Sequence, residues 1–127
     1  MGNSHFDLDK LLRFFKKGNI VYLEGDPAVQ GFWIKTGAVE LRRRFNSNEL
    51  IIGTCGPGDF FGVVPTVDRW VYTETAEVSQ DSEIFILKPA DLEQLVINNP
   101  SIGFDIVNNL SNQLRELDNK LDKLSKK

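Results

Sequence analysis

The chain has 127 residues, a length typical of one domain, and its 41% of hydrophobic residues is enough for a single packed core. A net charge of −3, with acids and bases interspersed, provides no basic surface for nucleic acid or an anionic membrane. One histidine and one cysteine exclude a zinc site of clustered ligands, an iron–sulfur cluster and a Ser-His-acid triad, so we expect no catalytic and no metal-binding residues.

Residues 4–16, "SHFDLDKLLRFFK", carry the pattern of an amphipathic helix. Ser4 and Asp7 fit a capping box at its start, and Gly18 follows two lysines that suit a helix C-terminus. Apolar side chains recur at steps of three and four, at Leu8, Leu11, Leu12 and Phe15. The sequence therefore predicts an N-terminal helix over 4–16.

Residues 19–88 have the pattern of short strands separated by turns. The run "NIVYLEGDP" ends in turn chemistry, and a Thr-Gly pair at 36–37 predicts a turn. After it Val39, Leu41 and Phe45 alternate with Glu40, Arg42 and Arg44, and Arg43 shares the apolar face near its edge. "ELIIGTC" is the returning strand, and "WVYTETAEV" and "SEIFILK" are two further strands. With no helical pattern between them, these strands predict a small antiparallel jelly-roll β-barrel, so the fold is mainly β with flanking helices.

Two helices are predicted to complete this single domain, over 89–99 and 100–125. Pro89 suits the first turn of one helix, and Asn99 followed by Pro100 suits the start of the next. The second carries a heptad seam at Val107, Leu110, Leu114, Leu117, Leu121 and Leu124. Packing on the chain's own barrel would cover the start of this seam only, so we expect a homodimer through this helix.

Three glycine-containing segments occur in a familiar order: "FKKGNIVYLEGDP", "GFWIKTGAVEL" and "GPGDFFG". Together with the leucine seam they resemble the cyclic nucleotide-binding domain of the cAMP receptor protein (CRP/FNR-like) family, over almost the whole chain. The resemblance implies a jelly-roll barrel with a dimerisation helix, and a cytoplasmic regulatory or sensor domain in signal transduction. Because the sequence contains no segment able to span a bilayer and no signal peptide, we expect no membrane contact.

In that family, the segment that corresponds to "GPGDFFGVVPTVDRWVYTET" is the phosphate-binding cassette. The resemblance places Gly62 at the glycine that lets backbone N–H groups approach the cyclic phosphate. It places Val63 at the glutamate that binds the ribose and Tyr72 at the arginine that pairs with the phosphate. Thr73 keeps the cassette hydroxyl, and Glu74 stands where the family has alanine. Two polar anchors are thus replaced and one carboxylate is added.

Four further residues are candidates for the ligand pocket. Val64 continues the hydrophobic part of the cassette, and Arg69 lies in the loop, where solvent exposure is the ordinary interpretation. Counting along the dimerisation helix, the family's base-contacting Thr-Ser pair falls at Leu117 and Asp118. These changes disfavour cAMP, or another cyclic nucleotide, bound in the usual way, and we expect no cofactor.

Three interpretations follow. The first is a homodimeric, non-catalytic regulatory domain whose pocket is empty or takes an atypical small-molecule effector, or which acts through a protein partner. The second is a genuine cyclic mono- or dinucleotide receptor, the effector half of a transcription regulator, using Arg69 and Thr73. The third is a jelly-roll enzyme with a carboxylate site. The sequence contains no recognition helix, so we expect no direct DNA binding by this chain, and Cys55 fits buried packing better than ligation.

Overall fold

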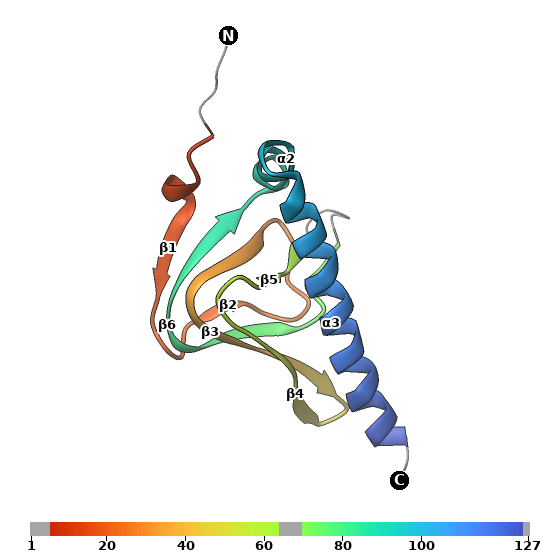
Figure 1. Ribbon diagram of the computed structural model, residues 1–127. Helices are drawn as coiled ribbons and strands as arrows, with labels where there is room; N and C mark the ends of the chain where they lie inside the picture. The colour runs from red at the N-terminus through yellow and green to blue at the C-terminus, as the bar shows by residue number, and fades with distance from the viewer. Residues whose placement is uncertain (1–5, 64–69, 126–127) are drawn as a thin grey trace.

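The computed structural model describes residues 6–63 and 70–125, which form a small antiparallel β-structure with two helices along one side (Figure 1). The elements in chain order are η1 (Leu8–Leu11), β1 (Leu12–Phe15), β2 (Ile20–Tyr22), β3 (Gly31–Phe45), β4 (Asn48–Cys55), β5 (Phe60–Phe61), β6 (Thr75–Leu87), α2 (Pro89–Asn98) and α3 (Pro100–Ser125).

The longest two strands, β3 and β6, organise the sheet. They pair with each other, β6 also pairs with β1 and β2, and β3 also pairs with β4 and β5. Every one of these pairings is antiparallel. The predicted antiparallel, mainly β fold is confirmed.

The predicted N-terminal helix over 4–16 is wrong in its second half. Within the described residues the helical part is one 3-10 turn, Leu8–Leu11, which begins where the Asp7 carboxylate accepts from the N–H of Asp9 at 3.2 Å. Residues 12–15 then form β1, in register with residues 82–85 of β6. The free edge of β6 supplies hydrogen bonds that a short amphipathic helix at the surface would not gain, and this tertiary pairing overrides the helical periodicity.

The predicted turn at 36–37 is also wrong, because β3 continues through it. Gly37 has φ +101° and lies among irregularities in the pairing between Ile34 and Val39. Opposite this irregular part of β3, β6 is also one continuous strand, although two were predicted. Its Ser82 is fully buried, donates to the carbonyl of Gln80 and accepts from the N–H of Ala38 at 3.0 Å. Matched irregularities therefore bend two long strands together, where the sequence suggested four short ones.

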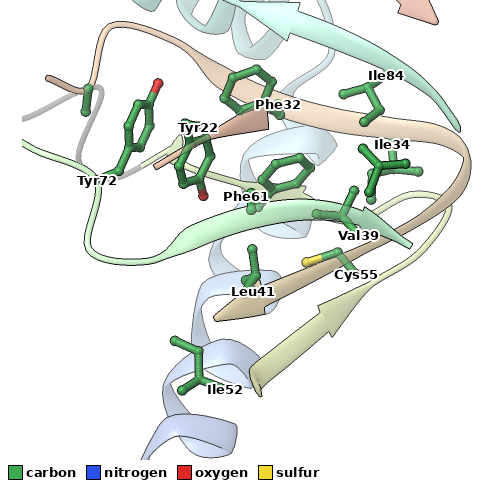
Figure 2. Close-up of a cluster of buried hydrophobic side chains, with 13 residues drawn as sticks. Tyr22, Phe32, Ile34, Val39, Leu41, Ile52, Cys55, Phe61, Tyr72 and Ile84 are labelled. Carbon is green, nitrogen blue, oxygen red and sulfur yellow. The ribbon is translucent and has the colours of Figure 1, made fainter. Parts of the chain in front are cut away.

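Two apolar clusters make up the core. The first fills the inside of the barrel and is rich in aromatic rings (Figure 2). Cys55 lies in it with 3% of its surface exposed, as expected from its place at the end of an apolar strand. The second lies between the barrel and the helices and consists of Phe60, Val63, Phe85, Leu87, Leu92, Leu95 and Ile102.

The helices start at the prolines. In α2 the N–H of Lys88 donates to the Asp91 carboxylate at 2.9 Å, which satisfies one backbone donor at the helix start. α3 packs against α2, β5 and β4, and Figure 1 shows it running along the barrel past the end of β4. Val107 is 59% exposed on this helix. The predictions for the side chains of Leu110, Leu114, Leu117, Leu121 and Leu124 fall outside the described part of the chain.

Candidate functional site

The cassette glycine, Gly62, follows directly after strand β5. Gly62 has φ +69°, in the left-handed region that favours glycine. A Cβ atom at this position would stand 3.2 Å from ring carbons of Phe32 and Tyr22 and 3.3 Å from Cε1 of Tyr72. The backbone of the cassette is therefore held close against an aromatic cluster, and only glycine fits there without displacing a ring.

Tyr72 occupies the space in front of that glycine. Its ring stacks on Tyr22, with centroids 3.8 Å apart and planes 13° from parallel, and 4% of its surface is exposed (Figure 2). Its hydroxyl donates to the carbonyl of Gln30 at 2.6 Å and accepts from the Gln30 N–H at 3.1 Å. Tyr72 points inward, as the alternation of the strand predicted, and its polar end is fully engaged with the backbone.

The extra carboxylate is also engaged. Glu74 is half-buried and accepts from the Tyr22 hydroxyl at 2.5 Å and from the Thr73 hydroxyl at 2.8 Å. Burial, and then the charge and hydrogen bond of Glu74, raise the pKa of Tyr22 well above its ordinary value, so this hydroxyl stays a donor. Thr73 is exposed, and its hydroxyl is oriented toward Glu74.

Val63 faces the other way. Although it follows Gly62 directly, its side chain belongs to the cluster beside α2, and Leu92 is in the same cluster. Gly62, Tyr72 and Glu74 are thus brought together around Tyr22, whereas Val63 is not. Two further candidates, Val64 and Arg69, lie outside the described residues.

The base-contacting candidates belong to α3. Along α3, Leu117 and Asp118 follow Asn109, which accepts a hydrogen bond from Phe60 of β5, and their side chains fall outside the described part. Sequence reasoning missed Tyr22 and Gln30, which complete the site. Both lie about 40 to 50 positions before Tyr72 and Glu74, and no spacing rule links residues so far apart in the chain.

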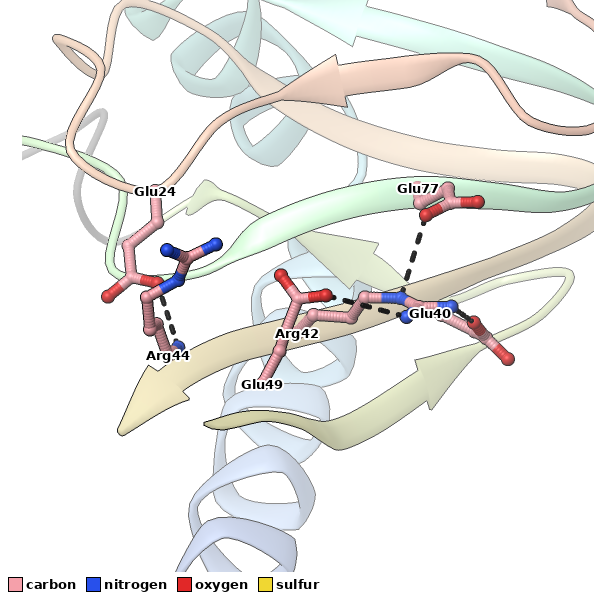
Figure 3. A network of polar contacts seen from close by, with 6 residues as sticks. All are labelled: Glu24, Glu40, Arg42, Arg44, Glu49 and Glu77. Carbon is pink, nitrogen blue, oxygen red and sulfur yellow. Dashed lines mark hydrogen bonds and ion pairs between the residues drawn. The ribbon is translucent and has the colours of Figure 1, made fainter. Parts of the chain in front are cut away.

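The arginine triplet at 42–44 is held within the sheet. Arg42 lies 2.7 Å from a carboxylate oxygen of Glu40 and 3.6 Å from oxygens of Glu49 and Glu77 (Figure 3). The hydrogen bond to Glu40 is the largest of the effects that raise the pKa of Arg42. This charge is balanced by acidic neighbours, so it does not form a basic surface.

The other two arginines divide between the faces of β3. The guanidinium carbon of Arg43 lies 5.6 Å from the ring centroid of Phe45, at the edge of the apolar face. Arg44 is exposed, and its backbone N–H donates to Glu24 at 3.0 Å. Both placements agree with the alternation read from the sequence.

Among the described residues, no group of three or more His, Cys, Asp or Glu is placed to hold a metal ion. Within the same ranges, none of the helices has the length and apolarity needed to cross a membrane.

The cassette geometry can be set beside known proteins. The family model of the cyclic nucleotide-binding domain matches residues 12–99. The chain belongs to this family. It is 27% identical over 114 residues to the cyclic AMP receptor protein of Thermus thermophilus, and these cover 89% of this chain and 53% of that protein. A CRP-like cAMP-activated global transcriptional regulator of Mycobacterium tuberculosis is 26% identical over 108 residues, 84% of this chain and 48% of the regulator.

Solved structures of this family have the same architecture. The catabolite activator protein of Thermus thermophilus superposes with a TM-score of 0.73 at 27% identity, over 90% of this chain and 54% of that one. The c-di-GMP responsive global regulator CLP of Xanthomonas campestris superposes with a TM-score of 0.80 at 22% identity. The superposition covers 91% of this chain and 59% of that one. The chain spans about half the length of these CRP-like relatives. It is a cyclic nucleotide-binding domain of the CRP-like type.

Proposed function

We propose that this domain is a non-catalytic regulatory domain, active as a homodimer, that does not bind cAMP or cGMP in the way usual for its family. The observation that carries the proposal is the stack of Tyr72 on Tyr22, which fills the barrel end against Gly62. A phosphate placed at the cassette would have to displace a buried ring and break both hydrogen bonds to Gln30. This interpretation rests on membership of the family and on the hydrogen bonds that Tyr72, Thr73 and Glu74 already make.

Electrostatics support the same conclusion. At the position of the family's arginine stands a phenol, and Glu74 places a carboxylate two residues further along the chain, directly before β6. A charge-assisted hydrogen bond contributes about 1.5–3 kcal/mol, so the missing guanidinium alone costs about tenfold to a hundredfold in affinity for a phosphate. Displacing the stacked rings of Tyr22 and Tyr72 would weaken binding further.

The test is calorimetric titration of cAMP and cGMP into the parent domain and into a Tyr72→Arg, Glu74→Ala double variant. We expect no heat of binding from the parent, and measurable binding from the double variant. The matched control is Tyr72→Phe, which keeps the ring in place and, like the parent, should show no heat of nucleotide binding. Thermal unfolding of each variant without nucleotide verifies that it is folded. Micromolar binding of cAMP or cGMP by the parent would overturn the proposal.

Val63 is kept out of this design on structural grounds. It stands at the cassette glutamate, but its side chain is 6% exposed within an apolar cluster. Val63→Glu would place a carboxylate there without a partner, which costs several kcal/mol and would confuse loss of fold with loss of binding. It enters only as a third substitution, once the double variant is shown to be folded.

The second candidate function, a cyclic dinucleotide receptor that uses Arg69 and Thr73, is favoured by one observation. The Thr73 hydroxyl is at the surface, where a ligand could take it from Glu74. Titration of c-di-GMP into the parent tests it. Binding that is lost in both Arg69→Ala and Thr73→Val would establish this candidate in place of the first.

A further inference from the structure

A cleft lies on the helix side of the cassette, away from Tyr72. Its volume is about 430 Å³, and it opens between α2, α3 and the residue after Gly62. Among the described residues that line it, Glu93 contributes the one carboxylate and the others are apolar or glycine. The lining residues are Val63, Pro89, Leu92, Glu93, Val96, Gly103 and Ile106.

Gly103 gives this cleft part of its depth, although no contact among the described residues requires a glycine there. It lies inside α3, and among the described residues a Cβ atom there would meet only Cγ1 of Val96 at 3.6 Å, an ordinary contact. Glycine inside a helix is less favourable than alanine by about 1 kcal/mol. The glycine destabilises the helix and leaves space in the cleft. We therefore expect a group from another molecule to occupy that space.

The same turn of α3 carries a large apolar side chain with no cover. Phe104 is 75% exposed and Val107 is 59% exposed. Successive residues of a helix are about 100° apart, so Phe104 points away from the cleft beside Gly103 and cannot fill it within one chain. The helix thus presents an apolar knob and an apolar hole on different sides.

The heptad phase brings knob and hole together between two copies. With Val107 at position a, Gly103 falls at d, Phe104 at e and Ile106 at g. In a parallel pair of helices, the e side of one helix faces the g side of the other across the a and d seam. Phe104 of each copy therefore faces the side of the other helix on which Gly103 and Ile106 line the cleft.

We propose that Phe104 of the partner subunit occupies this cleft, and that the two clefts of a homodimer are filled reciprocally. The proposal rests on the homodimer of the proposed function, and it places the partner subunit against Val63, the residue that follows the cassette glycine. A stable interface buries about 1,200–2,000 Å² in total. Two phenylalanines bury about 300–500 Å², roughly a quarter of that area, beyond what a short leucine seam provides.

The test is sedimentation equilibrium of the full chain and its variants, which measures the dimer dissociation constant. Phe104→Ala should raise that constant at least about tenfold, as for a buried aromatic anchor. Phe104→Leu should raise it less, and Asp105→Ala, an exposed neighbour, should leave it unchanged.

Gly103→Ala discriminates by the sign of its effect. If the seam alone holds the dimer, alanine at position d should tighten it, because the helix is stabilised and more apolar surface is buried. If a ring of the partner occupies the cleft, alanine narrows it and the dissociation constant should rise. Tighter dimers in Gly103→Ala would overturn the proposal.

A direct readout avoids any variant. In mixed dimers of methyl-labelled and unlabelled chains, isotope-filtered NOEs should connect the ring of Phe104 to methyl groups of Val63 and Ile106 in the other chain. Their absence, or a parent chain that is monomeric at micromolar concentration, would also overturn the proposal. The nucleotide titrations bear on the cassette alone, so the two proposals can fail separately.

Discussion

At the scale of single residues, the hydroxyl of Tyr22 joins strand β2 to the carboxylate of Glu74, 52 positions further along the chain. Removing it in Tyr22→Phe keeps the stacked ring but deprives Glu74 of one of its two donors. We expect a loss of about 1–2 kcal/mol in the free energy of unfolding near neutral pH, at the lower end of hydrogen bonds to charged groups because Thr73 still donates. Urea denaturation of both proteins measures it.

The stability difference between these two proteins should depend on pH. Burial and Glu74 hold the pKa of Tyr22 in the folded chain above the value near 10 that it has when unfolded. The stabilisation is therefore complete below about pH 10 and is lost as the pH rises from there toward the folded pKa. The gap between the unfolding free energies of the parent and Tyr22→Phe should therefore stay constant from about pH 8 to about pH 9 and narrow above about pH 10. A gap that stays constant up to about pH 11 would mean that the pKa of Tyr22 is not raised in the folded chain.

The sequence predicted which way the cassette residues point better than what they touch. Alternation along the sequence placed Tyr72, Glu74, Ala76 and Val78 on one inward face. Glu74 is half-buried and the other three are buried. The partners of Tyr72 come from β2 and from the segment before β3, and which distant strands become neighbours depends on closure of the sheet. Val63 was assigned through the family pattern to the ribose side, whereas the left-handed backbone at Gly62 precedes a side chain that turns toward α2.

At the scale of elements, one side chain connects α3 to the cassette segment, two residues before Gly62. The amide oxygen of Asn109 accepts from the backbone N–H of Phe60 at 2.7 Å, and Phe60 is 1% exposed. Asn109→Ala should cost about 1–2 kcal/mol, because a buried backbone donor loses this acceptor. The matched control is Asn108→Ala, an exposed neighbour, which should change stability by less than about 0.5 kcal/mol. Equal effects of the two substitutions would contradict this role.

Local signals identified α2 and α3, but they misjudged the N-terminal segment and the strands. Prolines at 89 and 100 mark helix starts through their fixed φ and missing N–H, properties that hold in any context, and both helices begin there. Residues 12–15 carry an apolar period that suits a helix, but pairing with β6 determines their conformation. The bends in β3 and β6 arise from one strand opposing the other, so the glycine and serine at them look like turns when each strand is read alone.

At the scale of the whole molecule, the heptad seam of α3 predicts a dimer. Leu114→Asp together with Leu121→Asp should yield monomers by light scattering, because two carboxylates per helix would oppose their counterparts across the seam. The matched control is Asn112→Asp with Asn119→Asp, which adds the same charge at exposed positions and should leave the dimer intact. A dimer that persists in the leucine double variant would place the contact elsewhere.

The central place of β6 in the sheet has a kinetic consequence for synthesis. Leu12 in β1 pairs with Phe85, and Gly31 in β3 pairs with Leu87, so both strands lack these neighbours until translation has reached residue 87. The β3–β4 hairpin, turned at Asn46 with φ +58°, can form earlier because its partners are close in sequence. A nascent chain that stalls before β6 therefore exposes one long strand edge of that hairpin, and such an edge is where pairing with another nascent chain begins.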